Sequence, residues 1–194
     1  MKKVLNVGGN SKKIPLPPEY EGWEHVLLDI DPKSEADVLC DARNLSSFDE
    51  DLYDSIYCSH NLEHYHRHDA VTVLKGFAHV LKPDGFVYLR VPDIGEVMRM
   101  VVEKNLDIDD FLYQSPAGPI MVRDVIYGYS VEIERSGNDF FAHKTGFTQK
   151  ALVSVLNMTG FGWVFSGTGN LEVKAFAFLT EPNDVNKRLL SLPS

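Results

Sequence analysis

Five short apolar segments of strand length, each closed by small or polar residues, constrain the fold more than any other feature of this sequence. Nearly continuous apolar runs of this kind are typical of parallel strands that are buried on both faces of a sheet. In open α/β sheets, ligands bind beyond the carboxyl ends of the strands. We therefore predict an α/β fold whose functional site lies where these segments end. The segments are residues 4–7, 25–30, 36–40, 53–59 and 86–91.

The bulk properties are those of a globular protein with a single domain. The 194 residues, of which 44% are hydrophobic, are enough for one domain with a real core, which we expect to span residues 1–194. The net charge of −9 argues against a nucleic-acid partner, because proteins that bind phosphate backbones carry basic patches. No apolar run approaches the length of a membrane span, so no membrane partner is expected. The N-terminal residues 1–10 are predicted to form a strand rather than a signal peptide.

Three prolines interrupt the place where a βαβ unit would put its first helix. Pro15, Pro17 and Pro18 follow the first strand, and a proline in a helix interior costs about 3 kcal/mol. We therefore predict that residues 11–22 form an extended crossover with at most one helical turn.

Glycine and aspartate follow the first three strands. Gly8 and Gly9 let a ligand approach the backbone closely, although two glycines are also an ordinary turn and the G-x-G-x-x-G fingerprint is absent. Asp29 stands 21 positions after Gly8, close to the spacing of about 20 residues at which an acidic side chain meets a ribose diol. Asp41 can accept a hydrogen bond from an exocyclic amine, or it caps a turn before Arg43.

Four of the seven histidines lie in the segment 53–68, around the end of the fourth strand. His60, Glu63 and His64 fit H-x-x-E-H, the inverted zinc-peptidase signature. That chemistry needs both histidines on one helical face, whereas His60 follows a strand directly and a third ligand is not evident. We therefore predict no metal site and place these histidines beside a ligand at the end of the strand.

The order and spacing of these segments resemble class I S-adenosylmethionine-dependent methyltransferases, and most of all the small group called methyltransferase type 11. The most specific pieces are YDSIYCSHNLEH (53–64) and LKPDGFVYLRVP (81–92). The resemblance covers residues 1–92 and resumes at 143–161. It implies a Rossmann-like fold with a mostly parallel seven-stranded sheet in the order 3-2-1-4-5-7-6, in which only strand 7 is antiparallel. Helices would cover both faces of this sheet, with the first helix largely missing here.

The resemblance also implies the cofactor S-adenosylmethionine. Asp29 would hold the ribose hydroxyls and Ile30 would pack on the adenine, whose edge Asp41 and the Ala42 backbone would read. His60 and the residue before it would border the methionine and the sulfonium. The cofactor-binding residues that the resemblance implies are Val7, Gly8, Gly9, Asn10, Asp29, Ile30, Asp41, Ala42, Ser59 and His60.

Three features depart from the family pattern. Asn6 replaces an acidic residue at the end of the first strand, and Asn10 replaces the second glycine. The crossover also lacks most of the helix whose N-terminal N–H groups and dipole would face the cofactor.

The two cysteines, Cys40 and Cys58, each close a predicted strand. In the implied sheet order these strands are three steps apart, about 14 Å, which is too far for a disulfide. We therefore predict two reduced thiols and a cytoplasmic location.

Residues 93–144 separate the two parts of the resemblance and are predicted to form an inserted cap or substrate region. The helical spacing of apolar residues from Ile94 to Val102 predicts a helix that packs on the sheet. The irregular stretch from Tyr127 to His143 carries several aromatic side chains and is either a substrate wall or a surface loop pinned by aromatic anchors. Further predicted elements are short helices at 108–113 and 120–127, a helix at 149–158 capped by Thr148, and an antiparallel pair of strands at 161–166 and 171–179.

Together, the strand ends and the resemblance predict methyl transfer by in-line displacement, in which the protein supplies mainly proximity and alignment. The acidic surface and the short cap favour a small-molecule, sugar-linked or lipid-linked acceptor. A base is needed only where the acceptor must lose a proton, and a histidine is the natural choice. His64 and His143 are the catalytic candidates, with His60 beside them, although each could equally be structural, His64 as a hydrogen-bonder at the start of the following helix.

Two other functions fit parts of the sequence. A non-catalytic descendant of the same fold would bind the cofactor or act as a scaffold, because fold does not imply function. A nicotinamide dehydrogenase would suit the sheet and Asp29 but lacks its glycine fingerprint. The oligomeric state stays open.

Overall fold

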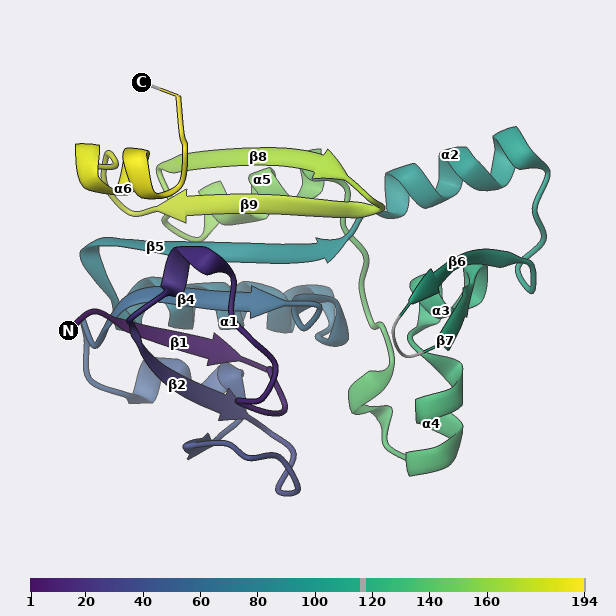
Figure 1. Cartoon of the computed structure of the whole chain (residues 1–194), viewed down its shortest axis with the longest axis horizontal. Helices are drawn as coiled ribbons and strands as arrows, with labels where there is room; N and C mark the ends of the chain where they lie inside the picture. Colours follow the sequence, from purple (N-terminus) through teal and green to yellow (C-terminus); the bar gives the residue numbers. More distant parts are fainter. Residues whose placement is uncertain (116–117, 194) are drawn as a thin grey trace.

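A seven-stranded mixed sheet forms the centre of the computed structural model, which describes residues 1–115 and 118–193 (Figure 1). The strand order β3-β2-β1-β4-β5-β9-β8 confirms the predicted order 3-2-1-4-5-7-6. Among the described strands of this sheet, β9 alone runs against the others, since it pairs antiparallel with both β5 and β8. The strands are β1 (Lys3–Val7), β2 (Glu24–Asp29), β3 (Val38–Leu39), β4 (Tyr53–Ser59), β5 (Leu81–Pro92), β8 (Trp163–Gly169) and β9 (Glu172–Phe178).

The parallel pairings bring the carboxyl ends of the first four strands to one edge of the sheet. Val7 of β1 lies opposite Leu28 of β2 and Cys58 of β4. Asp29 at the end of β2 lies opposite Leu39 of β3. The loops that follow these strands therefore start side by side, as the sequence pattern predicts.

One face of the sheet is covered by helices that carry a continuous apolar stripe. Phe77, Leu45 and Leu152 are fully buried in the same core cluster as the strand residues beneath them. The first long helix begins at Arg67, and Asp69 lies in its first turn, where a carboxylate interacts favourably with the helix dipole. The elements on this face are η2 (Ala42–Ser47), α1 (Arg67–Val80) and α5 (Gln149–Met158, capped by Thr148 as predicted).

The other face is covered by the proline-rich crossover and a short C-terminal helix, so the first helix is largely missing, as predicted. The crossover contains a single 3-10 turn, η1 (Pro18–Tyr20). The ring of Tyr20 stacks on Phe86 at a centroid distance of 6.0 Å, and its hydroxyl lies 3.0 Å from Oγ of Ser55. Tyr20 therefore fills part of the space of the missing helix. The C-terminal helix on this face is α6 (Asp184–Leu189).

Residues 93–144, apart from the undescribed 116–117, form a separate lobe at the end of β5 (Figure 1). Its apolar side chains form their own cluster around Val97, Leu112, Ile120 and Val125. The lobe consists of α2 (Ile94–Lys104), β6 (Phe111–Ser115), β7 (Gly118–Met121), α3 (Val122–Tyr127), α4 (Ser130–Ser136) and η4 (Asp139–Phe141).

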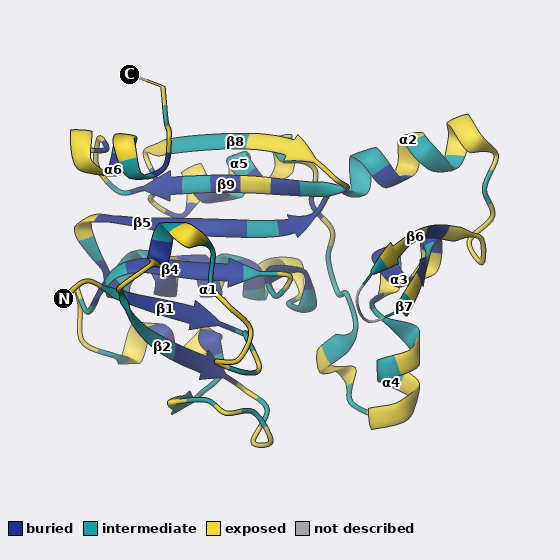
Figure 2. Cartoon of the chain, in the orientation of Figure 1, coloured by how far each residue is buried: buried dark blue, intermediate teal, exposed yellow. Residues whose placement is uncertain are grey.

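Two expectations for this lobe were wrong. Helix α2 does not lie on the sheet, and Figure 2 shows it largely outside the buried core. Met98 is 62% exposed and Val102 is 81% exposed, because helical periodicity identifies an apolar face but not the element that covers it. The predicted helix at 108–113 is the start of the β6–β7 hairpin. Among the described residues, no helix is long and apolar enough to cross a membrane.

Candidate functional site

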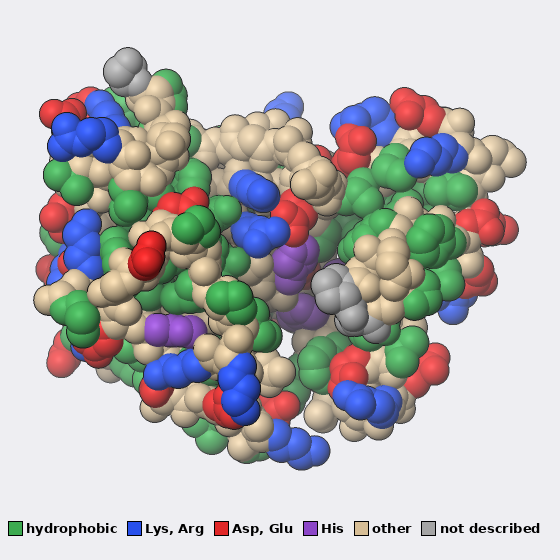
Figure 3. All heavy atoms as spheres, in the orientation of Figure 1, with side chains coloured by type: hydrophobic (Ala, Val, Ile, Leu, Met, Phe, Trp, Pro, Cys, Tyr) green, Lys and Arg blue, Asp and Glu red, His purple; other side chains and the backbone are tan. Residues whose placement is uncertain are grey.

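A cavity of about 460 Å³ lies at the carboxyl ends of β1 to β4 and reaches the lobe formed by residues 93–144. This volume is within the range of about 300–1,000 Å³ that small-molecule and cofactor sites occupy. On the face drawn in Figure 3, histidine side chains lie between the sheet and the lobe. The cavity is lined by Gly8, Asn10, Asp29, Ile30, Asp31, Asp41, Arg43, His60, Asn61, His64, Tyr65, His66, Asp69, Asp139, Phe140, Phe141 and Lys144.

The loop after β1 has the backbone of a glycine-rich ligand loop. Gly8 has φ +74°, and its N–H donates to the carbonyl oxygen of Leu28 at 2.8 Å. A Cβ at Gly8 would lie 2.1 Å from Nδ2 of Asn61, so only glycine fits there. Asn10 has φ +58°, a left-handed conformation that asparagine adopts more readily than most residues. The asparagine at the family's glycine position is therefore compatible with the loop.

Asp29 ends β2 with an oriented and nearly buried carboxylate. Its Oδ2 accepts the N–H of Asn10 at 2.9 Å and its Oδ1 accepts the N–H of Asp31 at 2.9 Å. The side chain lines the cavity, although the residue is only 7% exposed. Each carboxylate oxygen has two lone-pair sites, so both oxygens can still accept from a diol.

Asp41 has the turn-capping role that the sequence left open as an alternative. Its Oδ1 accepts the N–H of Arg43 at 2.9 Å, and its Oδ2 accepts from the Arg43 guanidinium at 2.6 Å. Burial by itself would raise the pKa of Asp41, but the hydrogen bonds from Arg43 lower it below its usual value. The carboxylate also lines the cavity, so an amine could reach it only as a further donor.

His60 is held in a charged network that the sequence did not indicate. It has φ +49°, and its Nε2 donates to Oε1 of Glu172 at 2.7 Å. Arg90 of β5 donates to the same carboxylate at 2.7 Å. Burial alone would lower the pKa of His60, but the hydrogen bond to Glu172 and the negative charges of Glu172 and Glu63 raise it to about 9. His60 is therefore an imidazolium at neutral pH and is unsuited to act as a base.

We expect Glu172→Gln to remove a pH-dependent part of the stability. Burial opposes ionisation of Glu172, but hydrogen bonds from His60 and Arg90 lower its pKa from 4.5 to about 2. The carboxylate therefore stabilises the fold above pH 4.5, by on the order of 2 kcal/mol, and this contribution is lost as the pH falls toward 2. Unfolding free energies of both proteins from pH 7 to pH 2 should differ most at neutral pH and converge in acid.

Glu181→Gln is the matched control for this change. Glu181 pairs with Lys187 at 3.7 Å but is 65% exposed, so its loss should cost well under about 1 kcal/mol at any pH. A difference between wild type and Glu172→Gln that stays constant from pH 7 to pH 2 would contradict the assignment.

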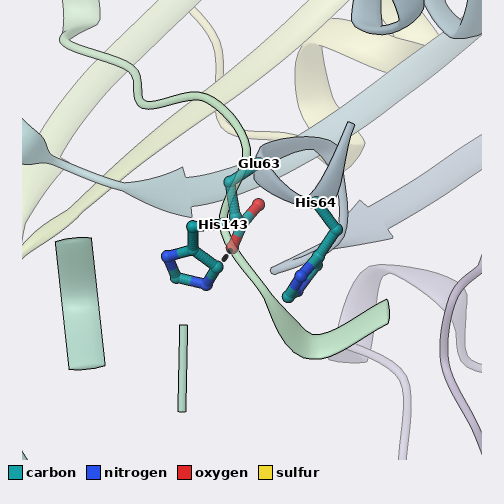
Figure 4. A group of neighbouring side chains, drawn as sticks. All are labelled: Glu63, His64 and His143. Atoms are coloured by element: carbon teal, nitrogen blue, oxygen red, sulfur yellow. Dashed lines mark ion pairs between the residues drawn. The ribbon is translucent and has the colours of Figure 1, made fainter. Parts of the chain in front are cut away.

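Glu63, His64 and His143 meet beside the cavity (Figure 4). Glu63 and His64 belong to η3 (Leu62–His64), directly after β4, whereas His143 follows η4. The two segments are tied together because Lys144 and Thr145 donate their N–H groups to the carbonyl oxygen of Glu63 at 2.8 and 3.2 Å. Nε2 of His143 lies 4.0 Å from Oε1 of Glu63.

The protonation of this cluster follows from its burial. Burial would raise the pKa of Glu63, but the neighbouring imidazoles, above all His60, lower it, so the carboxylate is ionised. Burial lowers the pKa of His143, and the charge of Glu63 only partly opposes this. Nδ1 of His143 lies 2.8 Å from the carbonyl oxygen of Val125, so Nδ1 carries the proton and Nε2 keeps its lone pair.

The structure brings most of the predicted site residues to one place. The cofactor candidates Gly8, Asn10, Asp29, Ile30, Asp41 and His60 line the cavity, and Val7, Gly9, Ala42 and Ser59 are their direct neighbours in the chain. Of the catalytic candidates, His64 lines the cavity, whereas His143 lies behind it and contacts Glu63.

Only part of the predicted substrate wall lines the cavity, and several lining residues were missed. Phe140 and Phe141 are in the lining, whereas Tyr127 is 60% exposed. Asn61 and Tyr65 lie in the histidine segment, where proximity to the strand end could have indicated them. No sequence pattern indicated that the cavity would also be lined by Arg43, Asp139 and Lys144. Glu172 comes from the last strand, and only the sheet order brings it to His60.

The lining residues fit S-adenosylmethionine. The acidic side chain of Asp29 is fixed by two backbone N–H groups at the strand end where a ribose diol is expected. The adjacent loop leaves no room for a Cβ at Gly8, and Ile30, 36% exposed, offers an apolar surface at the same cavity. These groups provide acceptors for hydroxyls and a flat apolar contact, which a nucleoside needs.

Comparisons with known proteins agree with this interpretation. Residues 7–89 match the family model described as a methyltransferase domain. Among curated proteins, none matches the chain. A solved structure from Pyrococcus horikoshii is 17% identical with a TM-score of 0.59, over 91% of this chain and 81% of that one.

Two further solved structures carry descriptions of activity. A SAM-dependent methyltransferase from Archaeoglobus fulgidus is 15% identical with a TM-score of 0.57, over 91% of this chain and 85% of that one. A SAM-dependent methyltransferase from Methanosarcina mazei is 20% identical with a TM-score of 0.58, over 92% and 93%. These likenesses establish the fold, and the family match runs from the end of β1 through β2, β3 and β4 into β5. Residues 7–89 are therefore similar to a methyltransferase domain, and the chain shares the fold of solved SAM-dependent methyltransferases.

Proposed function

We propose that this protein is a methyltransferase that transfers the methyl group of S-adenosylmethionine to a small-molecule, sugar-linked or lipid-linked acceptor. The observation that carries the proposal is that the polar ends of β1 to β4 and the aromatic side chains of η4 line one cavity. The first set suits the cofactor and the second offers a wall for the acceptor. The inserted lobe at 93–144, of which residues 116–117 lie outside the description, is accordingly proposed as the substrate region.

The protein's part in the reaction is binding and alignment. When bound, the cofactor supplies an activated methyl group on a sulfonium, which needs no further activation by the enzyme. Asp29 would orient the ribose and Gly8 would allow close backbone approach. His60 would border the methionine part at the end of β4, and its own charge is paired with Glu172.

The acceptor class follows from the size and charge of the site. A cavity of about 460 Å³ shared with a nucleoside cofactor leaves room for a small group or for the end of a longer molecule. The lining carries acidic Asp31, Asp69 and Asp139 beside the basic Lys144, so the acceptor part is expected to be polar. The free thiols Cys40 and Cys58 agree with a cytoplasmic location, which is part of this proposal.

Where the acceptor must lose a proton, His64 and His143 are the proposed proton acceptors. Both are close to the cavity, and their rings are 4.9 Å apart in a T-shaped arrangement. A positioned histidine contributes about 100- to 10,000-fold to such a proton transfer.

Calorimetric titration with S-adenosylhomocysteine tests the proposal. We expect saturable binding of one molecule per chain, and methyl transfer from labelled cofactor to small polar acceptors that falls when His64→Ala or His143→Ala is introduced. No heat at millimolar ligand would refute cofactor binding. Tight binding without transfer to any acceptor class would instead favour the non-catalytic descendant of the fold.

A further inference from the structure

We propose that Glu63, His64 and His143 bind a divalent transition-metal ion of the Zn²⁺ type at the edge of the cofactor cavity. One possible ligand atom from each residue can be chosen so that all lie within 4.8 Å of one another. Two imidazoles and one carboxylate are a common ligand set for catalytic zinc and for other divalent transition metals. The sequence predicted no metal site because its third ligand, His143, stands far from the other two along the chain.

The carboxylate of Glu63 is the strongest argument for a cation. The residue is 1% exposed, and among the described residues neither carboxylate oxygen has a hydrogen-bond partner. Its ionic neighbours are Nδ1 of His60 at 3.6 Å and Nε2 of His143 at 4.0 Å, both beyond hydrogen-bond distance. Burying a carboxylate without hydrogen bonds is costly. A cation between Glu63 and the two histidines would compensate for this cost.

His143 is oriented as a metal ligand would be. Its Nδ1–H donates to the carbonyl oxygen of Val125 at 2.8 Å, which leaves Nε2 with a free lone pair at 4.0 Å from Oε1 of Glu63 (Figure 4). Histidines that bind metals usually donate their other ring N–H to a carbonyl or carboxylate in this way. The backbone N–H of His143 also donates to the carbonyl oxygen of Tyr127 at 2.9 Å, so the residue is fixed at both ends.

His64 can offer one of its two ring nitrogens as a metal ligand. Its Nδ1 lies 3.2 Å from the carbonyl oxygen of Ala142, and its Nε2 lies 3.2 Å from the carbonyl oxygen of His60. A neutral imidazole carries one N–H and can therefore donate to only one of these carbonyls. The nitrogen without a proton cannot hydrogen-bond to its neighbouring carbonyl and would be the one that binds the ion.

The position of the site suggests what the ion does. His64 lines the cavity, and three protein ligands leave a coordination position free for water or an acceptor oxygen. A bound ion lowers the pKa of such a hydroxyl, whose proton would then pass to bulk water. With the ion bound, His64 and His143 would act as its ligands, and the proton-acceptor role proposed above would apply only to the metal-free protein. This role for the acceptor rests on the proposed function, whereas binding of the ion does not.

Metal titration of chelator-treated protein without cofactor tests the site separately from methyl transfer. We expect Zn²⁺ to bind one ion per chain with micromolar or tighter affinity, and Mg²⁺ to bind much more weakly because it prefers oxygen ligands. Glu63→Gln and His143→Asn should each weaken Zn²⁺ binding by about tenfold or more. His68→Gln is the control, because His68 is 81% exposed and lies outside the cluster, so this variant should bind Zn²⁺ as the wild type does.

Binding of Co²⁺ gives a second readout that uses only the wild-type protein and therefore does not depend on whether the variants fold. We expect wild-type protein to develop a visible Co²⁺ absorption band that one equivalent of Zn²⁺ displaces. Absence of this band together with absence of stoichiometric Zn²⁺ binding would overturn the proposal. Binding that survives Glu63→Gln and His143→Asn, or that is lost in His68→Gln, would overturn it as well, because it would come from surface histidines.

Discussion

Asp29→Asn is expected to weaken binding of S-adenosylhomocysteine by on the order of tenfold to a hundredfold, because hydrogen bonds to a charged group contribute about 1.5–3 kcal/mol. The substitution keeps the shape of the side chain and one acceptor oxygen, which can still accept the N–H of Asn10 or of Asp31. It removes the negative charge and replaces one acceptor oxygen by an NH₂ donor. The side chain can then no longer accept hydrogen bonds from both hydroxyls of the ribose. Calorimetric titration of wild type and variant measures the difference.

Asp31→Asn separates the specific role of Asp29 from the general field of the acidic cavity. Asp31 lies two residues further along, lines the same cavity, and uses its Oδ1 to accept the N–H of Lys33 at 2.9 Å. We expect this control to change affinity by less than about threefold, since the Asp31 carboxylate is in contact with solvent, which weakens its interaction with a bound ligand. Equal losses in both variants would show that Asp29 acts only through its charge. An unchanged affinity in Asp29→Asn would remove it from the cofactor site.

Gly8→Ala is expected to reduce both stability and cofactor affinity. A left-handed backbone costs an alanine about 1–2 kcal/mol, and Gly8 has φ +74°. The new Cβ would also lie 2.1 Å from Nδ2 and 2.5 Å from Cγ of Asn61, so this side chain must move. Asn61 lines the cavity, so its displacement should lower affinity for S-adenosylhomocysteine by about tenfold or more. Thermal unfolding and calorimetry measure the two effects.

Gly137→Ala isolates the backbone part of this effect. Gly137 has φ +66° at the end of α4, and among the described residues nothing lies within 4 Å of a Cβ built there. The control should lower the melting temperature by about 2–8 °C through the same backbone cost and leave affinity unchanged. The opposite result would be that Gly8→Ala loses no more stability than Gly137→Ala and binds S-adenosylhomocysteine as the wild type does. The side chain of Asn61 could then move away from the new Cβ, and the loop would be less tightly packed than the distances to Asn61 indicate.

The strands and the candidate ligand-binding edge of the sheet could be predicted because both depend on local patterns, whereas the order of the strands was implied by the resemblance to a known family. Strand-length apolar runs followed by Gly8, Asp29 and Asp41 identify parallel strands and their ends. The three prolines after β1 excluded a helix by sterics alone, and the structure has only the turn Pro18–Tyr20 there. In these cases the physical cause acts within a few residues of the chain.

The lobe was harder to predict because its sequence pattern identifies the apolar face of a helix but not the element against which that face packs. Residues 94–102 carry helical periodicity, and a helix forms there, yet it packs with α3 and the β6–β7 hairpin rather than on the sheet. Residues 108–113 were predicted as a helix and instead enter a hairpin, whose strands are stabilised by cross-strand pairs such as Tyr113 with Ile120. Pairing of this kind overrides weak local propensity.

The sequence by itself predicted the resemblance to methyltransferases, the strands of the sheet and the line of strand ends on which Asp29, Asp41 and His60 stand. Only the tertiary structure determined which side chains those residues contact. Glu172 reaches His60 because β9 pairs with β5, and His143 reaches Glu63 because the chain returns from the lobe with Lys144 hydrogen-bonded to the carbonyl oxygen of Glu63. The separations of 112 residues for His60–Glu172 and 80 residues for Glu63–His143 leave no periodic signal in the chain. Contacts that sheet pairing and lobe packing create are set by the folded arrangement, so the cluster of Glu63, His64 and His143 became visible only there.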